Sequence, residues 1–419
     1  MAGATKTTAD SALKEDYQPA VREQLNNEIK ILTYVEKNTK DVNGRRAVLS
    51  LHVSRNSGIG SRAELGTLPT AGSQGYAEER ISLKYHYGRG QISGPLMRAS
   101  DSDKGAFERA LDAETRRIVD DLKRDVNRQV WGTSDGIIAQ CALTTSSLQV
   151  NLAHTTGSGA SVSASDVQFR QLEVGMLVDI GTVAAPTMKT SGNAIVRTGG
   201  SGTAAAPYWI ELTSVATTTG TDYIFRSGNG GSSSNQKEVT GLQTIVDSAG
   251  TLFNINPDTY SSWKASEFGN SGTNRQISET LMAQVVQDIN INSGTWPNLG
   301  VCHHGVFRAY ANLLLGLKRF NDTTKLKGGY DAGIPFIGGG GSVIPIVPER
   351  DCPANSLYFI NTDHLTEFMD SDWEFMQEDG AVLSRVSNLD AYEFVLFKGM
   401  EVGTDQRNTH GKLTDISHA

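Results

Sequence analysis

The longest helical pattern in the chain runs from residue 102 to residue 131. The apolar residues that recur there at steps of four and seven are Phe107, Leu111, Ile118, Leu122 and Val126. This spacing lines one face of an α-helix, and the other face carries opposite charges four positions apart, such as Asp112 and Arg116. The pattern predicts a single helix about 45 Å long, with Ser102 as its N-cap and an end at Gly132.

An alternating pattern replaces the helical one in residues 46–98. Residues 46–55 and 80–94 alternate apolar and polar side chains, as strands do, and residues 57–75 between them are rich in glycine and turn formers. A structureless loop of about 20 residues is uncommon inside a compact domain. The pattern therefore predicts an extended hairpin whose tip projects onto something else.

The rest of the chain mixes both patterns around a β-rich stretch. Residues 144–240 contain short strand-like runs separated by Gly- and Ser-rich turns, which predicts a small all-β insertion. After it, residues 278–290 and 304–319 have helical spacing, and residues 356–368 and 391–408 have that of strands. A helical stretch is also predicted near the beginning, over residues 17–37. The fold class is α+β with an inserted all-β domain.

Composition excludes several classes of protein. The chain has 419 residues, 20% of them charged, and a net charge of −8. It contains no run of about 18 apolar residues, so no membrane span is expected, and its first residues lack the apolar segment of a secretory signal. Three widely spaced cysteines, Cys141, Cys302 and Cys352, argue against a disulfide framework and favour buried thiols.

The strongest enzyme-like motif is GxGxxA at residues 58–63, with Glu78 and Glu79 about twenty residues further on. A dinucleotide site needs a helix directly after these glycines. The following residues include Pro69 and several glycines, so we reject this site. The other candidates, Cys302-His303-His304, the glycines 338–341 and the acidic run 369–380, lack the spacing of a metal or phosphate site. No catalytic, cofactor-binding or metal-binding residue is predicted.

Charge is distributed unevenly along the chain. Residues 45–98 carry eight basic against three acidic side chains, a net charge of +5, and residues 351–395 carry one against ten, a net charge of −9. The imbalance favours head-to-tail self-association, although neutralisation within one chain or contact with nucleic acid would use the same charges. The predicted intersubunit contacts are the basic residues Arg55, Arg62, Arg80 and Arg89 and the acidic residues Asp370, Asp372, Glu374 and Glu378.

This order of segments resembles the major capsid proteins of tailed bacteriophages, whose fold is named after phage Hong Kong 97. Residues 83–132, from LKYHYGRG to NRQVWG, look like the loop-to-spine segment of the actinophage-type proteins, and residues 333–365, beginning GIPFIGGGG, look like a later peripheral segment. The resemblance implies a Hong Kong 97-like fold with an N-arm (1–45), an E-loop (46–98), a peripheral domain with the spine helix (99–143), the all-β insertion (144–240), an axial domain (241–345) and a return to the peripheral domain (346–419).

The resemblance also implies a function. Such a protein, without catalysis or cofactor, would form the pentamers and hexamers of an icosahedral capsid around double-stranded DNA that it contacts non-specifically. Its partners would be a portal protein, a separate scaffolding protein and a decoration protein. It would reside in the virion capsid after assembly in the host cytoplasm. Lys84, at the loop's base, is the only lysine between Asn43 and Lys104, so a non-covalent shell is expected. An encapsulin-type nanocompartment is the alternative, and a nucleotide-binding enzyme a weaker one.

Overall fold

The computed structural model describes residues 30–44, 46–96, 110–153, 166–183, 188–202, 206–230, 236–315, 334–337, 343–377 and 382–418. The chain divides into two compact units. The described residues of unit 1 fall within His86–Arg124 and Trp373–Lys398, and those of unit 2 fall within Ile29–Tyr85, Asp125–Asp372 and Gly399–Ala419.

Unit 1 is built on the predicted spine helix. Helix α3 (Ala110–Val130) contributes its part up to Arg124. The strands of unit 1 are most of β5 (Lys84–Ser93), β18 (Glu374–Phe375), β19 (Ser384–Arg385) and the first part of β20 (Ala391–Thr404), with which β18 and β19 pair antiparallel. A side chain at Gly90 would collide with Ile118 and Phe394, so the strand backbone lies directly on the helix's apolar face.

The prediction for this helix is confirmed where the structure describes it. Ile118 and Leu122 of the apolar stripe lie against the glycines of β5. The helix ends at Val130, and the N–H of Gly132 donates to the carbonyl of Gln129 at 2.8 Å in the closing turn. Ser102, the predicted N-cap, and Phe107 lie outside the described residues.

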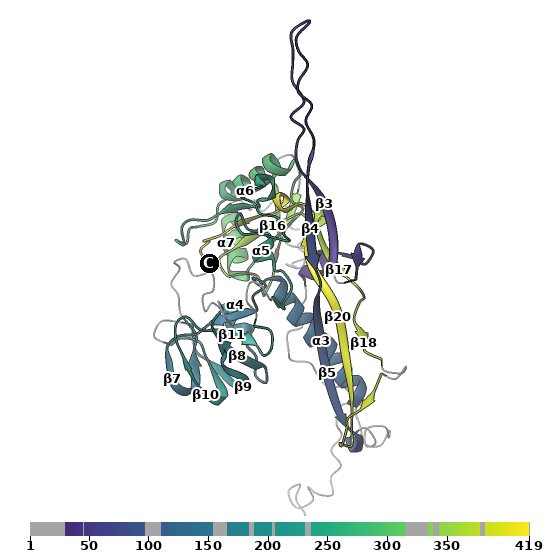
Figure 1. Ribbon diagram of the computed structural model, residues 1–419. Coiled ribbons are helices and arrows are strands. Elements are labelled where there is room, and N and C mark those ends of the chain that lie inside the picture. Colours follow the sequence, from purple (N-terminus) through teal and green to yellow (C-terminus); the bar gives the residue numbers. More distant parts are fainter. Residues whose placement is uncertain are drawn as a thin grey trace, which may run out of the picture. The chain divides into compact units, whose positions relative to one another are not determined.

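Unit 2 contains a six-stranded sheet in the order β12-β21-β16-β13-β15-β14. Its strands are β12 (Ser266–Phe268), β13 (Leu299–Cys302), β14 (Ile334–Ile337), β15 (Val343–Pro348), β16 (Leu357–Ile360) and β21 (Gly411–Leu413). Helices α6 (Glu279–Ser293) and α7 (His304–Leu315) pack on it through one apolar core (Figure 1). Both helices confirm the sequence pattern where it is described, and residues 316–319 of the second predicted helix lie outside the described residues. Helix α6 begins where the Ser278 hydroxyl accepts a hydrogen bond from the N–H of Leu281.

The predicted all-β insertion is a second six-stranded sheet, in the order β6-β11-β8-β9-β10-β7. Its strands are β6 (Ile137–Gln140), β7 (Thr144–Asn151), β8 (Leu177–Gly181), β9 (Met188–Gly199), β10 (Trp209–Thr218) and β11 (Tyr223–Arg226). The two ends of this order meet in an antiparallel bridge between Cys141 and Leu152, so the sheet closes into a small barrel. Because β6 belongs to the barrel, the insertion's sheet begins before residue 144.

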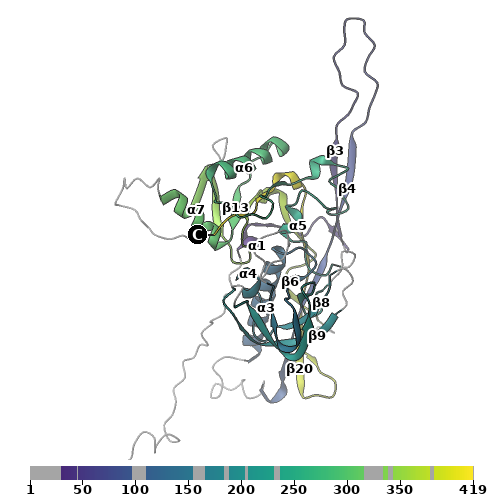
Figure 2. The same ribbon diagram turned by 90° about the vertical axis from the view of Figure 1, so that its left-hand side faces the viewer.

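The predicted hairpin forms a third sheet of unit 2, with the order β2-β3-β4. Its strands are β2 (Val42–Asn43), β3 (Arg46–Ser54) and β4 (Gly75–Ser82), and the connection between β3 and β4 projects beyond the rest of unit 2 (Figure 1 and Figure 2). One detail of the prediction was wrong. Residues 80–94 are not one strand, because the chain leaves β4 at the buried Leu83 and continues as β5.

The predicted helix over residues 17–37 is only partly tested. Helix α1 (Ile31–Tyr34) lies inside it, but Glu36 and Lys37 belong to strand β1 (Glu36–Asn38), so the end of the predicted helix was wrong. This strand pairs in parallel with β17 (Leu365–Met369), which pairs antiparallel with the last part of β20. A backbone partner more than 300 residues away, which no local pattern reveals, decides this conformation. No helix in the described part of the chain is long and apolar enough to cross a membrane.

Candidate functional site

The hairpin tip, defined as residues 55–74, contains two of the predicted basic contacts. Arg55 is exposed, and no carboxylate among the described residues lies within 4.0 Å of it. Arg62 is also exposed, but its guanidinium donates to the carbonyl of Thr67 through Nε and to that of Ser61 through Nη1, each at 2.9 Å. Arg62 therefore orders the tip's own backbone and still presents its charge to solvent.

Three large aliphatic side chains stand exposed on the same tip. Ile59 and Leu68 are 79% and 83% exposed, and Leu65 is fully exposed. The charge pattern did not predict these three residues as contacts. Their position among glycines and polar residues could have indicated that they are exposed. Solvated aliphatic groups clustered on a projecting loop are typical of a surface that another molecule covers.

Leu65 also has an unfavourable backbone conformation. The N–H of Gly66 donates to the carbonyl of Ala63 at 2.9 Å, and inside this turn Leu65 has a φ of 62°. Glycine and asparagine occupy such a position at low cost, whereas leucine is strained there. Local strain that places an apolar group in water indicates a role outside the isolated chain.

The neck of the tip is held by one side chain. Asn56 accepts a hydrogen bond from the N–H of Gly58 at 2.6 Å and donates to the carbonyl of Gly72 at 3.0 Å. A side chain at Gly72 would collide with Asn56 and Ser57, so the two limbs approach closely there. The tip is thus an organised loop, although no helix or strand is assigned within it.

The other two predicted basic contacts are paired inside the chain. On the outer face of β4, the guanidinium of Arg80 binds the carboxylate of Glu78 at 3.0 Å, and this hydrogen bond lowers the pKa of Glu78. In unit 1, Arg89 binds the carboxylate of Glu393 across β5 and β20. Neutralisation within the chain, one of the alternatives, therefore occurs at these two positions.

The predicted acidic residues are distributed over both units. In unit 2, Asp372 binds Lys37 at 3.1 Å, and the Asp370 carboxylate accepts the N–H of Ser371 at 2.7 Å. Glu374 lies in β18 of unit 1, and Glu378 is outside the described residues. The contact of these residues with the basic tip of another subunit stays a prediction.

A cluster of buried charges joins the barrel to the end of helix α3 in unit 2. Arg128 binds Asp125 at 3.1 Å and Glu238 at 2.5 Å, and Arg226 of β11 binds Asp125 at 3.1 Å. Burial opposes the ionisation of Asp125, but the two guanidinium groups overcome it and hold the pKa of this carboxyl well below its usual value. The cluster therefore fixes the barrel to the helix through fully charged partners.

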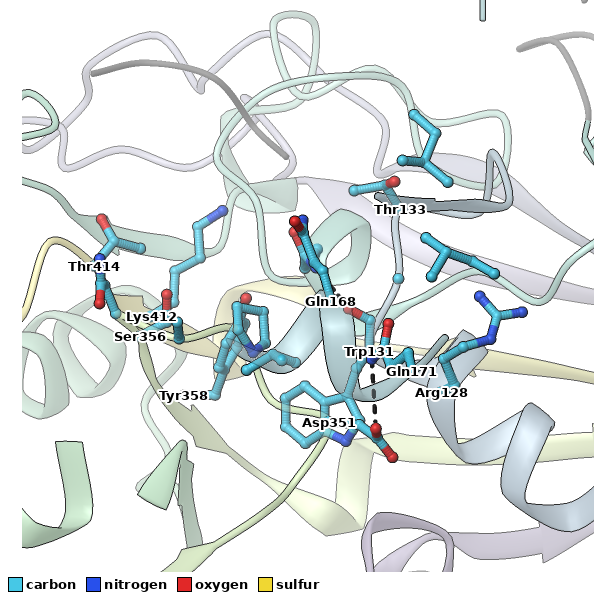
Figure 3. Close-up of a pocket in the computed structure, with 18 of the residues that line it drawn as sticks. Arg128, Trp131, Thr133, Gln168, Gln171, Asp351, Ser356, Tyr358, Lys412 and Thr414 are labelled. Atoms are coloured by element: carbon cyan, nitrogen blue, oxygen red, sulfur yellow. Dashed lines mark hydrogen bonds between the residues drawn. The ribbon is translucent and has the colours of Figure 1, made fainter. Parts of the chain in front are cut away.

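A cleft of about 450 Å³ lies beside this cluster and is lined by the barrel, the end of α3 and the strands β16 and β21 (Figure 3). Its charged groups already have partners within the chain. The Nζ atom of Lys412 lies 3.0 Å from Glu267, and Asp351 accepts hydrogen bonds from Asn127 and Gln171. The charged groups that line the cleft are therefore engaged in contacts within the subunit.

The motif at residues 58–63 lacks the helix that a dinucleotide site needs directly after its glycines. Residues 58–63 lie in the hairpin tip, and none of the residues between β3 and β4 forms a helix. The described residues contain no group of three or more side chains suited to a metal ion. Burial raises the pKa of the thiols of Cys141 and Cys302, which makes them poor nucleophiles. The glycines 338–341 lie outside the described residues, whereas strands β14 and β15 on either side of them are described.

Comparison with solved structures identifies the fold. A chain of the cyanophage A-1(L) capsid asymmetric unit is 14% identical, with a TM-score of 0.62 over 99% of each chain. Chains from the capsids of empty and native GTA particles have TM-scores of 0.54 and 0.52 at 10% and 11% identity, covering 99% of this chain and 100% of theirs. No protein-family model and no curated protein sequence matches the chain. The chain has the Hong Kong 97-like capsid fold, as the sequence predicted.

Proposed function

We propose that the chain is a major capsid protein that assembles into the pentamers and hexamers of an icosahedral shell around double-stranded DNA. The observation that carries the proposal is the likeness to capsid chains from end to end, insertion included, at 99% coverage. In this function the protein acts by self-association and not by catalysis. Its place is the virion capsid, after assembly in the host cytoplasm.

The hairpin tip supplies a physical reason for self-association. Ile59, Leu65 and Leu68 lose contact with water only if another molecule covers them, and burying one such side chain contributes about 1.5–3 kcal/mol. Each contact is modest, but every subunit of a closed shell both offers and receives one, so the contacts reinforce each other. Arg55 and Arg62 lie in the same tip and would direct it toward an acidic surface of a neighbouring copy.

The interior contact with DNA is weak in this proposal. A chain with a net charge of −8 has little non-specific affinity for a polyanion, so the DNA would be confined and not tightly bound. A portal protein, a scaffolding protein and a decoration protein complete the proposed set of partners. An encapsulin-type shell would differ in its contents, since it would enclose protein cargo.

The test is electron microscopy and light scattering of the recombinant full chain, alone and with a scaffold candidate from its own gene cluster. Closed shells, tubes or rings of five and six subunits support the proposal. A monomer or dimer that never assembles under either condition contradicts it. Shells isolated from their native source distinguish the alternatives, because packaged DNA supports the capsid and enclosed protein supports the nanocompartment.

A further inference from the structure

A buried carboxyl group lies at the root of the projecting hairpin. Glu79 is on the inward face of β4, directly across the ladder from Leu49 of β3, and its exposed fraction is 0%. Neither of its carboxyl oxygens has a hydrogen-bond partner among the residues that the structure describes. A buried carboxyl group without partners is unfavourable as an anion, so this position needs an explanation.

The hairpin root rests on the last part of β20. A side chain at Gly403 would collide with Ile81 of β4 and Phe368 of β17, so these three positions face each other. Side chains along a strand alternate between its faces, which places Glu401 on the same side of β20 as Gly403, and Asp405 directly follows the last residue of this strand, Thr404. Burial raises the pKa of Glu79, and the negative charge of Asp405 adds to this rise.

The other charged groups around the root are accounted for. On β3 the inward residues Ala47, Leu49, Leu51 and Val53 are apolar. Asp405 is paired with Nδ1 of His364 at 2.9 Å, Glu401 accepts the N–H of Thr240 at 2.6 Å, and Nζ of Lys84 donates to the carbonyl of Gln236 at 2.8 Å. Phe253, which packs against this root, brings no charge. Among the residues that the structure describes, no cation is therefore paired with Glu79.

We propose that Glu79 and Asp405 form a proton-dependent latch, in which a proton on Glu79 holds the hairpin root against β20 and its loss favours detachment. The attached root keeps Glu79 protonated in an apolar environment beside one carboxylate. The detached root exposes Glu79 to water, where it ionises freely. The latch is a property of the single subunit. Its use rests on the proposed function, because the hairpin is the arm that would reach a neighbouring copy.

Burial, with a smaller contribution from Asp405, raises the pKa of Glu79 from 4.5 to about 9. A raised pKa in the attached state means that attachment is strongest below pH 4.5, weakens as the pH rises, and stops changing above about pH 9. Within that window the ratio of detached to attached hairpin rises up to about tenfold for each pH unit, because one proton is released. Neutral pH lies inside the window, so small pH changes act on the hairpin.

The experiment is amide hydrogen exchange of the full-length subunit at about pH 5.5, 7 and 8.5, corrected for the intrinsic pH dependence of exchange. In the wild type, protection of β3 and β4 near the root is expected to fall by up to about tenfold per pH unit relative to helix α6. Burial raises the pKa of the neighbouring Glu401 to about 7, so the two carboxyl groups are separated best between pH 7 and 8.5. Glu79→Gln, which keeps the shape and cannot ionise, is expected to abolish the dependence in that range. Glu78→Gln is the matched control, since it removes the neighbouring charge on the outer face and should leave the dependence intact.

A second variant keeps the proposal testable if Glu79→Gln does not fold. The side chain of Asp405 is half exposed. Asp405→Asn removes the neighbouring charge, so the pH window should end at a lower pH. Root protection that does not change with pH in the wild type, or a slope between pH 7 and 8.5 that survives in Glu79→Gln, overturns the latch. Assembly is scored separately by electron microscopy. Shells with a pH-independent root refute only the latch, and a pH-dependent root in a subunit that never assembles refutes only the proposed function.

Discussion

The barrel and the hairpin tip differ in where their apolar side chains lie. The barrel closes on itself around thirteen buried residues, and its directly opposed strands place Ile180 against Ile224 in the interior. The tip has no interior of its own and presents Ile59, Leu65 and Leu68 to solvent. One region is stabilised by its own core, and the other gains apolar burial only from contact with another molecule.

The basic side chains of the two regions also differ, because those of the barrel have acidic partners and those of the tip have none in the described part of the chain. Arg226 of the barrel and Arg128 at its junction are bound to acidic partners, and on the barrel surface Arg197 binds Glu211 at 2.7 Å. In the tip, Arg55 and Arg62 have no carboxylate within 4.0 Å among the described residues. The difference shows that substitutions in the barrel should act on the subunit's stability, and those in the tip on its association.

The largest effect is expected for Arg128→Ala at the barrel junction. The change leaves the carboxylates of Asp125 and Glu238 buried without their shared partner, which should cost about 3–5 kcal/mol of unfolding free energy. Urea denaturation followed by circular dichroism measures it. Arg197→Ala on the barrel surface is the control, with a cost below about 1 kcal/mol. Equal losses in both variants would contradict the buried cluster as an anchor.

The same cluster predicts an acid-sensitive junction. Asp125 has a pKa held below its usual value of 3.8, so its contribution to stability is present above that pH and is lost as the pH falls below it. This sign is opposite to that of Glu79, whose contribution weakens as the pH rises.

A smaller effect is expected for Ile224→Val in the barrel core. Removing one methylene group from a closed core should lower the unfolding free energy by about 1 kcal/mol. The matched change in the tip is Leu68→Val, for which no measurable change is expected because the side chain is 83% exposed. A measurable loss for Leu68→Val would show that the tip does have a core within the subunit.

Leu65→Asn separates stability from assembly. Asparagine tolerates the φ of 62°, so the subunit's unfolding free energy should rise or stay within about 0.5 kcal/mol. If a neighbouring copy covers this position, the loss of apolar contact should reduce the yield of shells by about tenfold or more in light scattering. Leu65→Met keeps an apolar group and should assemble like the wild type. Unchanged assembly of Leu65→Asn would show that Leu65 is not part of the contact between subunits.

Lys84→Arg is expected to have no effect on the particles, which makes it the smallest change in this series. Lys84 donates to the carbonyl of Gln236 at the hairpin root and is remote from the tip, so it is not positioned for a covalent link there. Wild-type and variant particles should both run as a single band near 45.0 kDa on a denaturing gel. A ladder of larger species in the wild type that disappears in the variant would show a covalent shell.

The sequence by itself determined the elements whose signal is local. The apolar stripe of α3, the cap of α6 at Ser278 and the alternation of the barrel strands each follow from residues a few positions apart. The hairpin was predictable because turn residues separate two alternating runs. The charge imbalance located Arg55 and Arg62, since a charge in a projecting loop stays exposed wherever the rest of the chain folds.

Tertiary structure alone decided the features that depend on distant partners. Glu36 forms a strand because it pairs with Thr366, and Arg89 is neutralised by Glu393, which lies 304 positions further along the chain. Glu78 and Glu79 are neighbours of the same type, but strand alternation turns the first to solvent beside Arg80 and buries the second at the hairpin root. Composition cannot distinguish them, because the surface that covers Glu79 comes from β20 and exists only after the chain has folded.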